Sequence, residues 1–306
     1  MRKIYTLGET VLDIFFKDNQ PFAARAGGAC LNTAVSLGRL GLPVNFISEY
    51  GMDKAGDLIH NFLKENNIST DYIYRYPDGK SSLALAYLND RSDASYEFYK
   101  NYPEQRLCIE FPDVQEDDIV LFGSFYAITG EIRNKLLQFI KHANVNNAIV
   151  IYDPNFRKQH LDELAKLKPL IEENISLASI IRGSHEDFAY IFNANNADET
   201  YNVLNDKQKY LLYTNSSEGV NLMSDKLSLS VPVKKIKTIS TVGAGDNFNA
   251  GIVYSIYINN IHFDDIQNIN IEIWRQIIET AIEFATHVCS SYDNYISIDF
   301  AKKYML

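Results

Sequence analysis

The sequence predicts an α/β fold: a mostly parallel sheet between two layers of helices, with a smaller sheet beside it. Short apolar runs alternate with longer segments of helical periodicity through most of the 306 residues. This order is typical of parallel strands joined by right-handed helical connections. Glycine turns at residues 27–28 and 243–245 each precede a segment with helical spacing. Two aromatic-rich segments with strand-like alternation, at about residues 9–25 and 83–100, predict the smaller sheet.

Each element follows from its local pattern. Apolar runs bounded by polar or glycine residues predict strands at residues 4–7, 11–16, 21–25, 44–48, 83–88, 96–99, 119–122, 148–152, 178–181, 210–213, 220–223 and 227–231. Apolar residues at three- and four-residue spacing predict helices at residues 31–40, 53–66, 129–143, 161–174, 186–192, 248–258 and 273–290. Polar stretches predict a turn at residues 89–92 and a loop at 193–198.

The chain is expected to form one domain, because no repeat, low-complexity tract or proline- and glycine-rich linker divides residues 1–306. Residues 9–25 and 83–100 would then form a lid that closes over a cleft and excludes water. An exposed lid sheet with aromatic side chains and free edges is also a candidate surface for forming a homodimer.

Composition limits the partners of the chain. Hydrophobic residues make up 46% and aromatic residues 12%, which is enough for a large core. A net charge of −10 argues against binding nucleic acid or an anionic membrane. The cysteines Cys30, Cys108 and Cys289 lack metal-site spacing, which fits a reducing compartment. With no signal-peptide pattern and no run of eighteen apolar residues, we expect a soluble, cytoplasmic protein.

The segment Thr241–Phe248 is the strongest functional signal. Phe248 and Ile252 begin an apolar helical stripe, so Gly243 and Gly245 lie where a loop becomes a helix N-terminus. Glycines let a ligand approach the backbone, and the first amides of a helix lack internal partners, so the site suits a phosphate. Asp246, on the first turn, is a candidate base. A base beside a phosphate site is what phosphoryl transfer to an alcohol requires.

Other interpretations of this segment are weaker. A dinucleotide loop would have glycine where Phe248 stands, and it would lie near the start of the chain. A Walker A motif does not occur in the sequence. An ordinary glycine turn that only caps a helix is the simplest alternative. The adjacent Asp246 and a second glycine site near the N-terminus argue against it.

The second glycine site is Gly27-Gly28-Ala29, followed one helical turn later by Asn32. Asn32 is either a surface residue or an amide that fixes the hydroxyls of a ligand. Asp13 interrupts an apolar strand, so it is either a solvent-facing residue or a carboxylate that accepts hydrogen bonds from two sugar hydroxyls. Polar residues also follow three strands, at residues 153–157, 182–187 and 214–219. In an open α/β sheet these strand ends share the ligand-binding edge.

These motifs resemble those of the ribokinase-like, phosphofructokinase-B (PfkB) type carbohydrate kinases. Residues 240–248 match the signature D-T-x-G-A-G-D-x-F except at Ser240, and residues 27–41 match G-G-x-x-x-N-x-A followed by R-L-G. The resemblance implies a ribokinase-like fold and an ATP-dependent kinase that uses Mg²⁺. It also implies a set of site residues: Asp246 as base, amides of Gly243, Ala244 and Gly245 as anion hole, and Asp13, Gly28 and Asn32 at the sugar.

Three further motifs extend the resemblance. The run Asp153-Pro154-Asn155-Phe156-Arg157 is similar to that of fructokinases and 2-keto-3-deoxygluconate kinases, which implies sugar contacts for Asn155 and Arg157. Thr214, Ser216 and Gly219 resemble the nucleotide turn T-x-G-x-x-G of the family, with serine at its first glycine. Ser184 and Asp187 align with its N-x-x-E motif. This alignment predicts Ser184 at the nucleotide and Asp187 near magnesium through a water.

Fructose is the substrate that these motifs favour. The alternatives are another kinase of the family, acting on 2-keto-3-deoxygluconate, ribose or a nucleoside, and a sugar-binding regulatory protein that lost catalysis. Serine at positions 184, 216 and 240 motivates the regulatory alternative, whereas Asp246 and the intact Gly-Ala-Gly argue against it. Ser240 also replaces an aspartate that is linked in the family with monovalent-cation binding, so potassium activation is in doubt.

Overall fold

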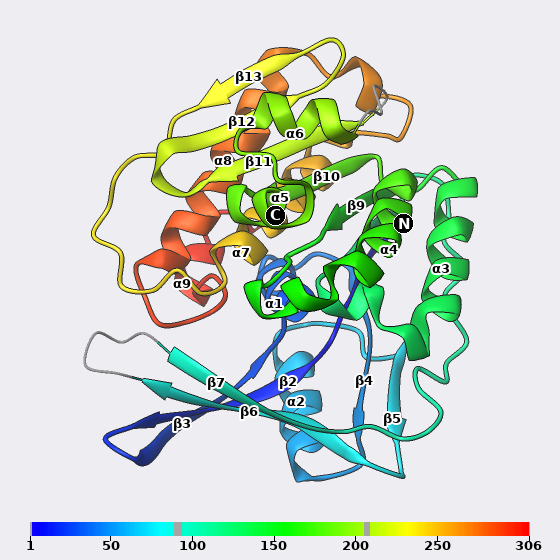
Figure 1. The fold of residues 1–306 in the computed structure, drawn as a ribbon, viewed down its shortest axis with the longest axis vertical. Helices are drawn as coiled ribbons and strands as arrows, with labels where there is room; N and C mark the ends of the chain where they lie inside the picture. The colour runs from blue at the N-terminus through cyan, green and yellow to red at the C-terminus, as the bar shows by residue number, and fades with distance from the viewer. Residues whose placement is uncertain (1, 89–93, 205–208, 306) are drawn as a thin grey trace.

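The computed structural model describes residues 2–88, 94–204 and 209–305. The turn expected at residues 89–92 lies outside these ranges. Within them the chain forms two sheets, a large one and a smaller one that crosses the end of the molecule opposite β13 (Figure 1). The described residues contain no helix that is both long and apolar enough to span a bilayer.

The large sheet has nine strands among the described residues, in the order β13-β12-β11-β10-β9-β8-β1-β4-β5. In this order, the strands β11, β10, β9, β8, β1, β4 and β5 run parallel to one another. β12 and β13 add an antiparallel edge. Their bounds are β1 Ile4–Leu7, β4 Val44–Gly51, β5 Ile73–Tyr76, β8 Ile119–Gly123, β9 Ile149–Asp153, β10 Ile180–Ser184, β11 Tyr210–Asn215, β12 Gly219–Met223 and β13 Ser228–Val231.

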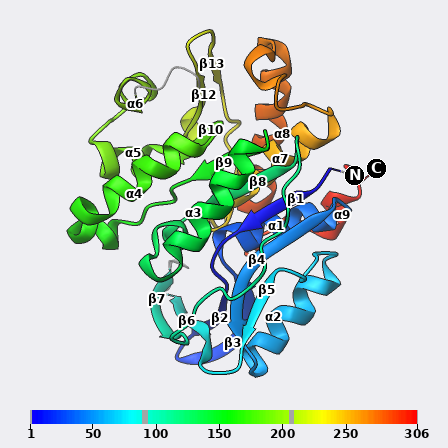
Figure 2. The same ribbon diagram turned by 90° about the vertical axis from the view of Figure 1, so that its right-hand side faces the viewer.

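Helices cover both faces of this sheet (Figure 2). The buried side chains of β9 alternate, with Ile149 and Ile151 in one apolar cluster and Val150 and Tyr152 in the other. The first cluster includes α1, α2, α7 and α8, and the second includes α3, α4 and α5. The predicted three-layer sandwich is therefore confirmed. The helices are α1 Ala29–Arg39, α2 Lys54–Glu65, α3 Gly130–Val145, α4 Leu164–Leu177, α5 His185–Phe192, α6 Ala197–Leu204, α7 Ala244–Ile258, α8 Ile271–Cys289 and α9 Ile298–Ala301.

The small sheet has the strand order β3-β2-β6-β7 in the described part of the chain. Its strands are β2 Val11–Lys17, β3 Gln20–Gly27, β6 Lys80–Leu88 and β7 Ala94–Asn101. β2 and β6 run parallel, whereas the two outer pairs are antiparallel. The register places Asp13 opposite Arg25 on one side and Ala84 on the other, so side chains at these positions point to the same face.

Some boundaries differ from the predictions for local reasons. α2 begins at Lys54 rather than at residue 53, because the Asp53 side chain caps the helix by accepting a hydrogen bond from Gly56 N at 2.8 Å. α4 begins at Leu164, because residues Lys158–Glu163 form a 3-10 helix first. β5 is a short edge strand containing Arg75, and α6 is a short, mostly polar helix. Neither has a strong apolar pattern, and both were missed.

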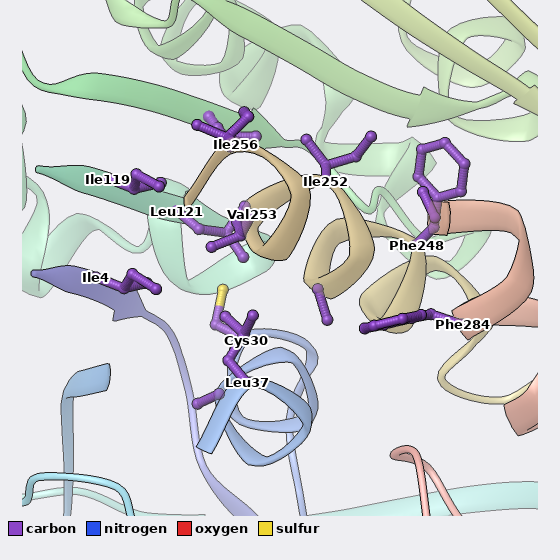
Figure 3. Close-up of a cluster of buried hydrophobic side chains, with 14 of the residues drawn as sticks. Ile4, Cys30, Leu37, Ile119, Leu121, Phe248, Ile252, Val253, Ile256 and Phe284 are labelled. Atoms are coloured by element: carbon purple, nitrogen blue, oxygen red, sulfur yellow. The ribbon is translucent and has the colours of Figure 1, made fainter. Parts of the chain in front are cut away.

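α7 lies between α1 and α8 on one face of the large sheet, and packing fixes its position (Figure 3). Ile252, Val253 and Ile256 point into a cluster with side chains of β1 and β8. On the α8 side the two helix backbones approach closely at Gly251. A Cβ atom built there would lie 2.4 Å from the Cα atom of Ala281. The start of α7 is therefore held by contacts along the whole helix.

We expect Gly251→Ala to destabilise the protein. Alanine has the better helix propensity, so a loss of stability would come from the contact with Ala281. Overpacking of this kind costs about 1–3 kcal/mol. Urea unfolding followed by circular dichroism measures the change. Gly130→Ala is the matched control, because a Cβ atom at that helical position meets nothing within 4 Å. Equal stability of the two variants would contradict close packing of α7 on α8.

Candidate active site

The N-terminus of α7 presents unpaired backbone amides. Gly243 precedes the helix with a φ of 80°, and a Cβ atom there would lie 2.6 Å from Asn294 O, so glycine is required. The amides of Gly243, Gly245 and Asp246 have no acceptor in the part of the chain that the structure describes. The Ala244 amide, also predicted as a donor, bonds to Thr241 O at 3.2 Å. Three free amides at a helix start suit an anion.

Asp246 lies on this first turn and is held by α1. Its Oδ2 atom accepts a hydrogen bond from Asn32 Nδ2 at 2.8 Å, and its backbone carbonyl accepts one from Thr33 Oγ1 at 2.8 Å. Burial raises the pKa of Asp246 to about 6, while the Asn32 hydrogen bond opposes that shift. The carboxylate is therefore ionised at neutral pH and close enough to its pKa to accept a proton.

Two acceptors near the start of α1 have no partner. Asp13 is only 7% exposed, and its carboxylate has neither a hydrogen bond nor an ion pair with any described residue. Burial raises its pKa to about 7. Asn32 donates to Asp246, but its Oδ1 atom is buried and also unbonded among the described residues. Buried polar atoms are normally satisfied, so both oxygens are suited to ligand hydroxyls.

The glycine pair makes this arrangement possible. A Cβ atom on Gly27 would lie 2.4 Å from Asp13 Oδ2, and one on Gly28 would lie 2.1 Å from Glu9 O. Gly28 also has a φ of 131°, which favours glycine. The structure thus brings the predicted residues Asp13, Gly28 and Asn32 to the junction of β2, β3 and α1.

The segment that follows β9 adds further polar groups to the candidate site. Asp153 Oδ1 accepts a hydrogen bond from Asn155 N at 3.0 Å, and Asn155 is half-buried with a φ of 39°. Arg157 is exposed, and its guanidinium has no hydrogen bond or ion pair with the described residues. Its positive charge acts to lower the pKa of both Asp246 and Tyr96 of β7.

A cavity of about 670 Å³ lies on the other side of the α7 N-terminus. Ala244 and Gly245 line one end, together with the predicted residues Ser184, Thr214 and Ser216. Apolar side chains of Val220, Val233, Ile236, Ile282 and Ala285 form part of the wall, and polar and charged residues complete it. Gly219 does not line the cavity, but its φ of 139° shapes the turn between β11 and β12. A lining that combines apolar side chains with polar groups suits a nucleotide.

Sequence reasoning missed much of this cavity. Residues 233–238 and the face of α8 toward the cavity carried no motif, although both line it. Arg182 was noted only as part of a polar strand end, yet it is buried at the cavity floor. A charge directly after the apolar pair Ile180-Ile181 was the one signal for it. Lys234 and Lys235 give the rim a positive charge in an otherwise acidic chain.

Both carboxylate oxygens of Asp187 already accept hydrogen bonds from the protein. Its Oδ2 atom accepts from Ser184 N at 2.7 Å and Ser184 Oγ at 2.6 Å, and its Oδ1 atom accepts from Phe156 N at 2.6 Å. The pair forms a capping box for α5. Among the described residues no group of three His, Cys, Asp or Glu side chains could hold a metal ion. Asp187 thus does not fit a direct magnesium ligand, and its role through water stays a prediction.

The small sheet contacts the loop beside the α7 N-terminus. Arg25 of β3 donates to the backbone carbonyl of Tyr292 and pairs with Asp293 at 3.2 Å. The next residue, Asn294, packs against Gly243 and accepts a hydrogen bond from Asn247 Nδ2 at 2.8 Å. Contacts through residues 292–294 thus connect the small sheet to Gly243 at the start of α7.

The chain is similar in sequence to proteins named as fructokinases. The chain is 27% identical over 269 residues to a fructokinase of Rhizobium leguminosarum bv. trifolii, covering 84% of this chain and 81% of that protein. It is also 27% identical to a probable chloroplastic fructokinase-6 of Arabidopsis thaliana, over 82% of this chain and 69% of the relative.

Solved structures share the fold. The fructokinase of Vibrio cholerae O395 with fructose, ADP and calcium superposes with a TM-score of 0.85 at 18% identity, covering 100% of this chain and 99% of that one. The fructokinase of Xylella fastidiosa with bound ATP gives a TM-score of 0.83 at 23% identity, over 99% and 98%. The family model described as pfkB family carbohydrate kinase matches residues 1–288. The chain belongs to the pfkB family of carbohydrate kinases.

Proposed function

We propose that this chain transfers the γ-phosphoryl group of ATP to a hydroxyl of fructose, with Asp246 as general base. One observation carries the proposal: a carboxylate with a pKa of about 6 lies on the same helical turn as three free amides, at the end of a nucleotide-sized cavity. The relatives and solved structures named as fructokinases support fructose as the sugar.

Asp246 would take the proton of the attacking hydroxyl. The Asn32 hydrogen bond to Oδ2 leaves Oδ1 as the atom available to the sugar. Because the bond stabilises the charged form, Asn32 keeps the base ionised despite its burial. The amides of Gly243, Gly245 and Asp246 would hold the phosphoryl oxygens, where fixed dipoles stabilise the charge that spreads over them during transfer.

The sugar would lie between the small sheet and α7. Asp13 Oδ atoms and Asn32 Oδ1 are the free acceptors for its hydroxyls. Asn155 and the unpaired Arg157 would approach it from the segment after β9. Gly28 would let the sugar lie against the start of α1. We propose that the small sheet acts as a lid, with Arg25 linking it to the loop at residues 292–294.

The nucleotide would occupy the cavity. Its base fits the apolar walls of β12 and α8, and its phosphates would point to Thr214, Ser216 and the start of α7. Mg²⁺ held by the ATP phosphates would supply further charge neutralisation, since magnesium in kinase sites is bound largely through substrate phosphates. Ser240 stands where the family signature has an aspartate linked with monovalent-cation binding, so we expect turnover without added potassium.

The edge strands of the lid are a candidate dimer surface. Phe22 and Tyr99 are 57% and 54% exposed on its edge strands. Exposed aromatic side chains on open strand edges favour association with a second sheet.

Measuring ADP formation with ATP, magnesium and single sugars tests the function. We expect turnover with fructose, and a product heavier than fructose by one phosphoryl group. The panel includes ribose, 2-keto-3-deoxygluconate and adenosine. Faster turnover with one of these would overturn the choice of fructose while keeping the kinase. No turnover with any of them, together with thermal stabilisation by fructose, would favour the regulatory alternative.

Asp246→Asn should abolish most turnover and leave fructose binding intact, because the amide keeps the shape but cannot accept the proton. Loss of a positioned base lowers kcat by about 10²–10⁴-fold. Steady-state kinetics gives kcat, and calorimetry gives the dissociation constant for fructose. Asp264→Asn, at an exposed position, is the matched control. Wild-type kcat in Asp246→Asn would remove Asp246 from the mechanism.

A further inference from the structure

Arg182 of β10 lies on the cavity floor, where it joins groups from three elements. Its NH1 atom donates to Asp153 Oδ2 of β9 at 2.8 Å, and its NH2 atom donates to Thr214 Oγ1 of β11 at 3.0 Å. The residue is 7% exposed, and its Nε atom is buried with no partner among the described residues. The Nε atom of Arg133 is also buried and unbonded among the described residues, so the contacts of NH1 and NH2 are what distinguish Arg182.

The guanidinium also lies directly under the first turn of α7. A Cβ atom on Gly245 would be 2.7 Å from NH1 and 3.0 Å from NH2, so only glycine leaves room for it. The Phe248 ring lies on the same side, with its centroid 5.6 Å from the guanidinium carbon. The charge is therefore fixed next to the turn whose amides of Gly243, Gly245 and Asp246 are free.

Three carboxylates act on Arg182. Asp153 is its one ion-pair partner among the described residues, and that carboxylate also accepts from Asn249 Nδ2 at 2.7 Å and Asn155 N. Asp187, which is hydrogen-bonded in its capping box with Ser184, and Asp246 also interact with the guanidinium electrostatically. Arg182 is therefore a buried positive charge among acids at the phosphate end of the cavity, where the family motif N-x-x-E is replaced by serine and aspartate.

We propose that Arg182 is a positioning residue for phosphoryl transfer. Its guanidinium bonds to Thr214 and lies against Gly245. It therefore fixes the distance between these two residues, which line the phosphate end of the cavity. Its charge also lies beneath the anion hole and favours the ionised form of Asp246. This inference rests on the proposed kinase function. A buried arginine that only stabilises the fold would do none of this.

The groups that act on Asp246 make the charge effect measurable. Asp153 of β9 raises the pKa of Asp246, whereas Arg157 and Arg182 lower it; Asn32 of α1 bonds to it, and the neighbouring Cys30 thiol is itself uncharged. Removing the positive charge at position 182 raises the pKa of the base. Because the base must be ionised, activity would then be lost at a higher pH than in the wild type.

Arg182→Met, Arg182→Gln and Arg182→Lys are compared with the wild type in ATP- and fructose-dependent kinetics from pH 5 to 8. For the wild type we expect kcat to fall below about pH 6, as the base is protonated. We expect Arg182→Met to lower kcat and to move the fall in kcat at low pH to a higher pH. Arg182→Lys keeps the positive charge, so its kcat should fall at the same pH as in the wild type.

Arg133→Met is the matched control. Arg133 is also 7% exposed and pairs with Glu173 at 2.6 Å, but it lies on α3 at the opposite face of the sheet. We expect this variant to lose stability and keep the wild-type pH profile. Arg182→Gln replaces Arg182→Met if the latter does not fold. A folded neutral variant whose kcat, and the pH at which kcat falls, equal those of the wild type would overturn the inference. An inactive wild type would overturn the proposed function as well.

Discussion

The contact between Asn32 and Asp246 is the constraint on which the site depends. One hydrogen bond joins α1, which follows β3 of the small sheet, to α7, which follows β13, the last strand of the chain. It orients a carboxylate that burial would otherwise favour in its neutral form. Thr33 and Ser36 of α1 add hydrogen bonds to Asp246 O and Asn247 Oδ1. These bonds between α1 and α7 form a seam. The charge, position and direction of the base are thus set by a neighbouring helix.

Glycines allow this seam to form. Gly27 and Gly28 bring the backbone before α1 against Asp13 and Glu9, and Gly243 and Gly245 do the same for α7 against Asn294 and Arg182. Two helix starts therefore meet, and α7 has free amides at that point. In the proposed function the sugar would contact Asp13 and Asn32 while the nucleotide fills the cavity lined by Gly245, so that the two bound substrates would meet at the start of α7.

The sequence could predict what depends on local pattern. The parallel sheet, the small sheet and the glycine turn before Asp246 were recognisable because apolar spacing and glycine position carry them. It could not predict that Asn32 bonds to a residue 214 positions later, or that Phe156 N occupies a carboxylate oxygen of Asp187. In the sequence Arg182 is one of several polar residues at a strand end, and only the fold shows that it lies against Gly245. The short β5 and polar α6 lacked periodicity, so packing alone reveals them.

A crystal structure with fructose, ADP, magnesium and aluminium fluoride as the phosphoryl mimic tests the central claim most directly. The account predicts Asp246 Oδ1 within hydrogen-bond distance of one sugar hydroxyl, with Asn32 still bonded to Oδ2. It also predicts fluorides on the amides of Gly243, Gly245 and Asp246. A carboxylate turned away from the sugar, or a mimic bound elsewhere than at the start of α7, would contradict it.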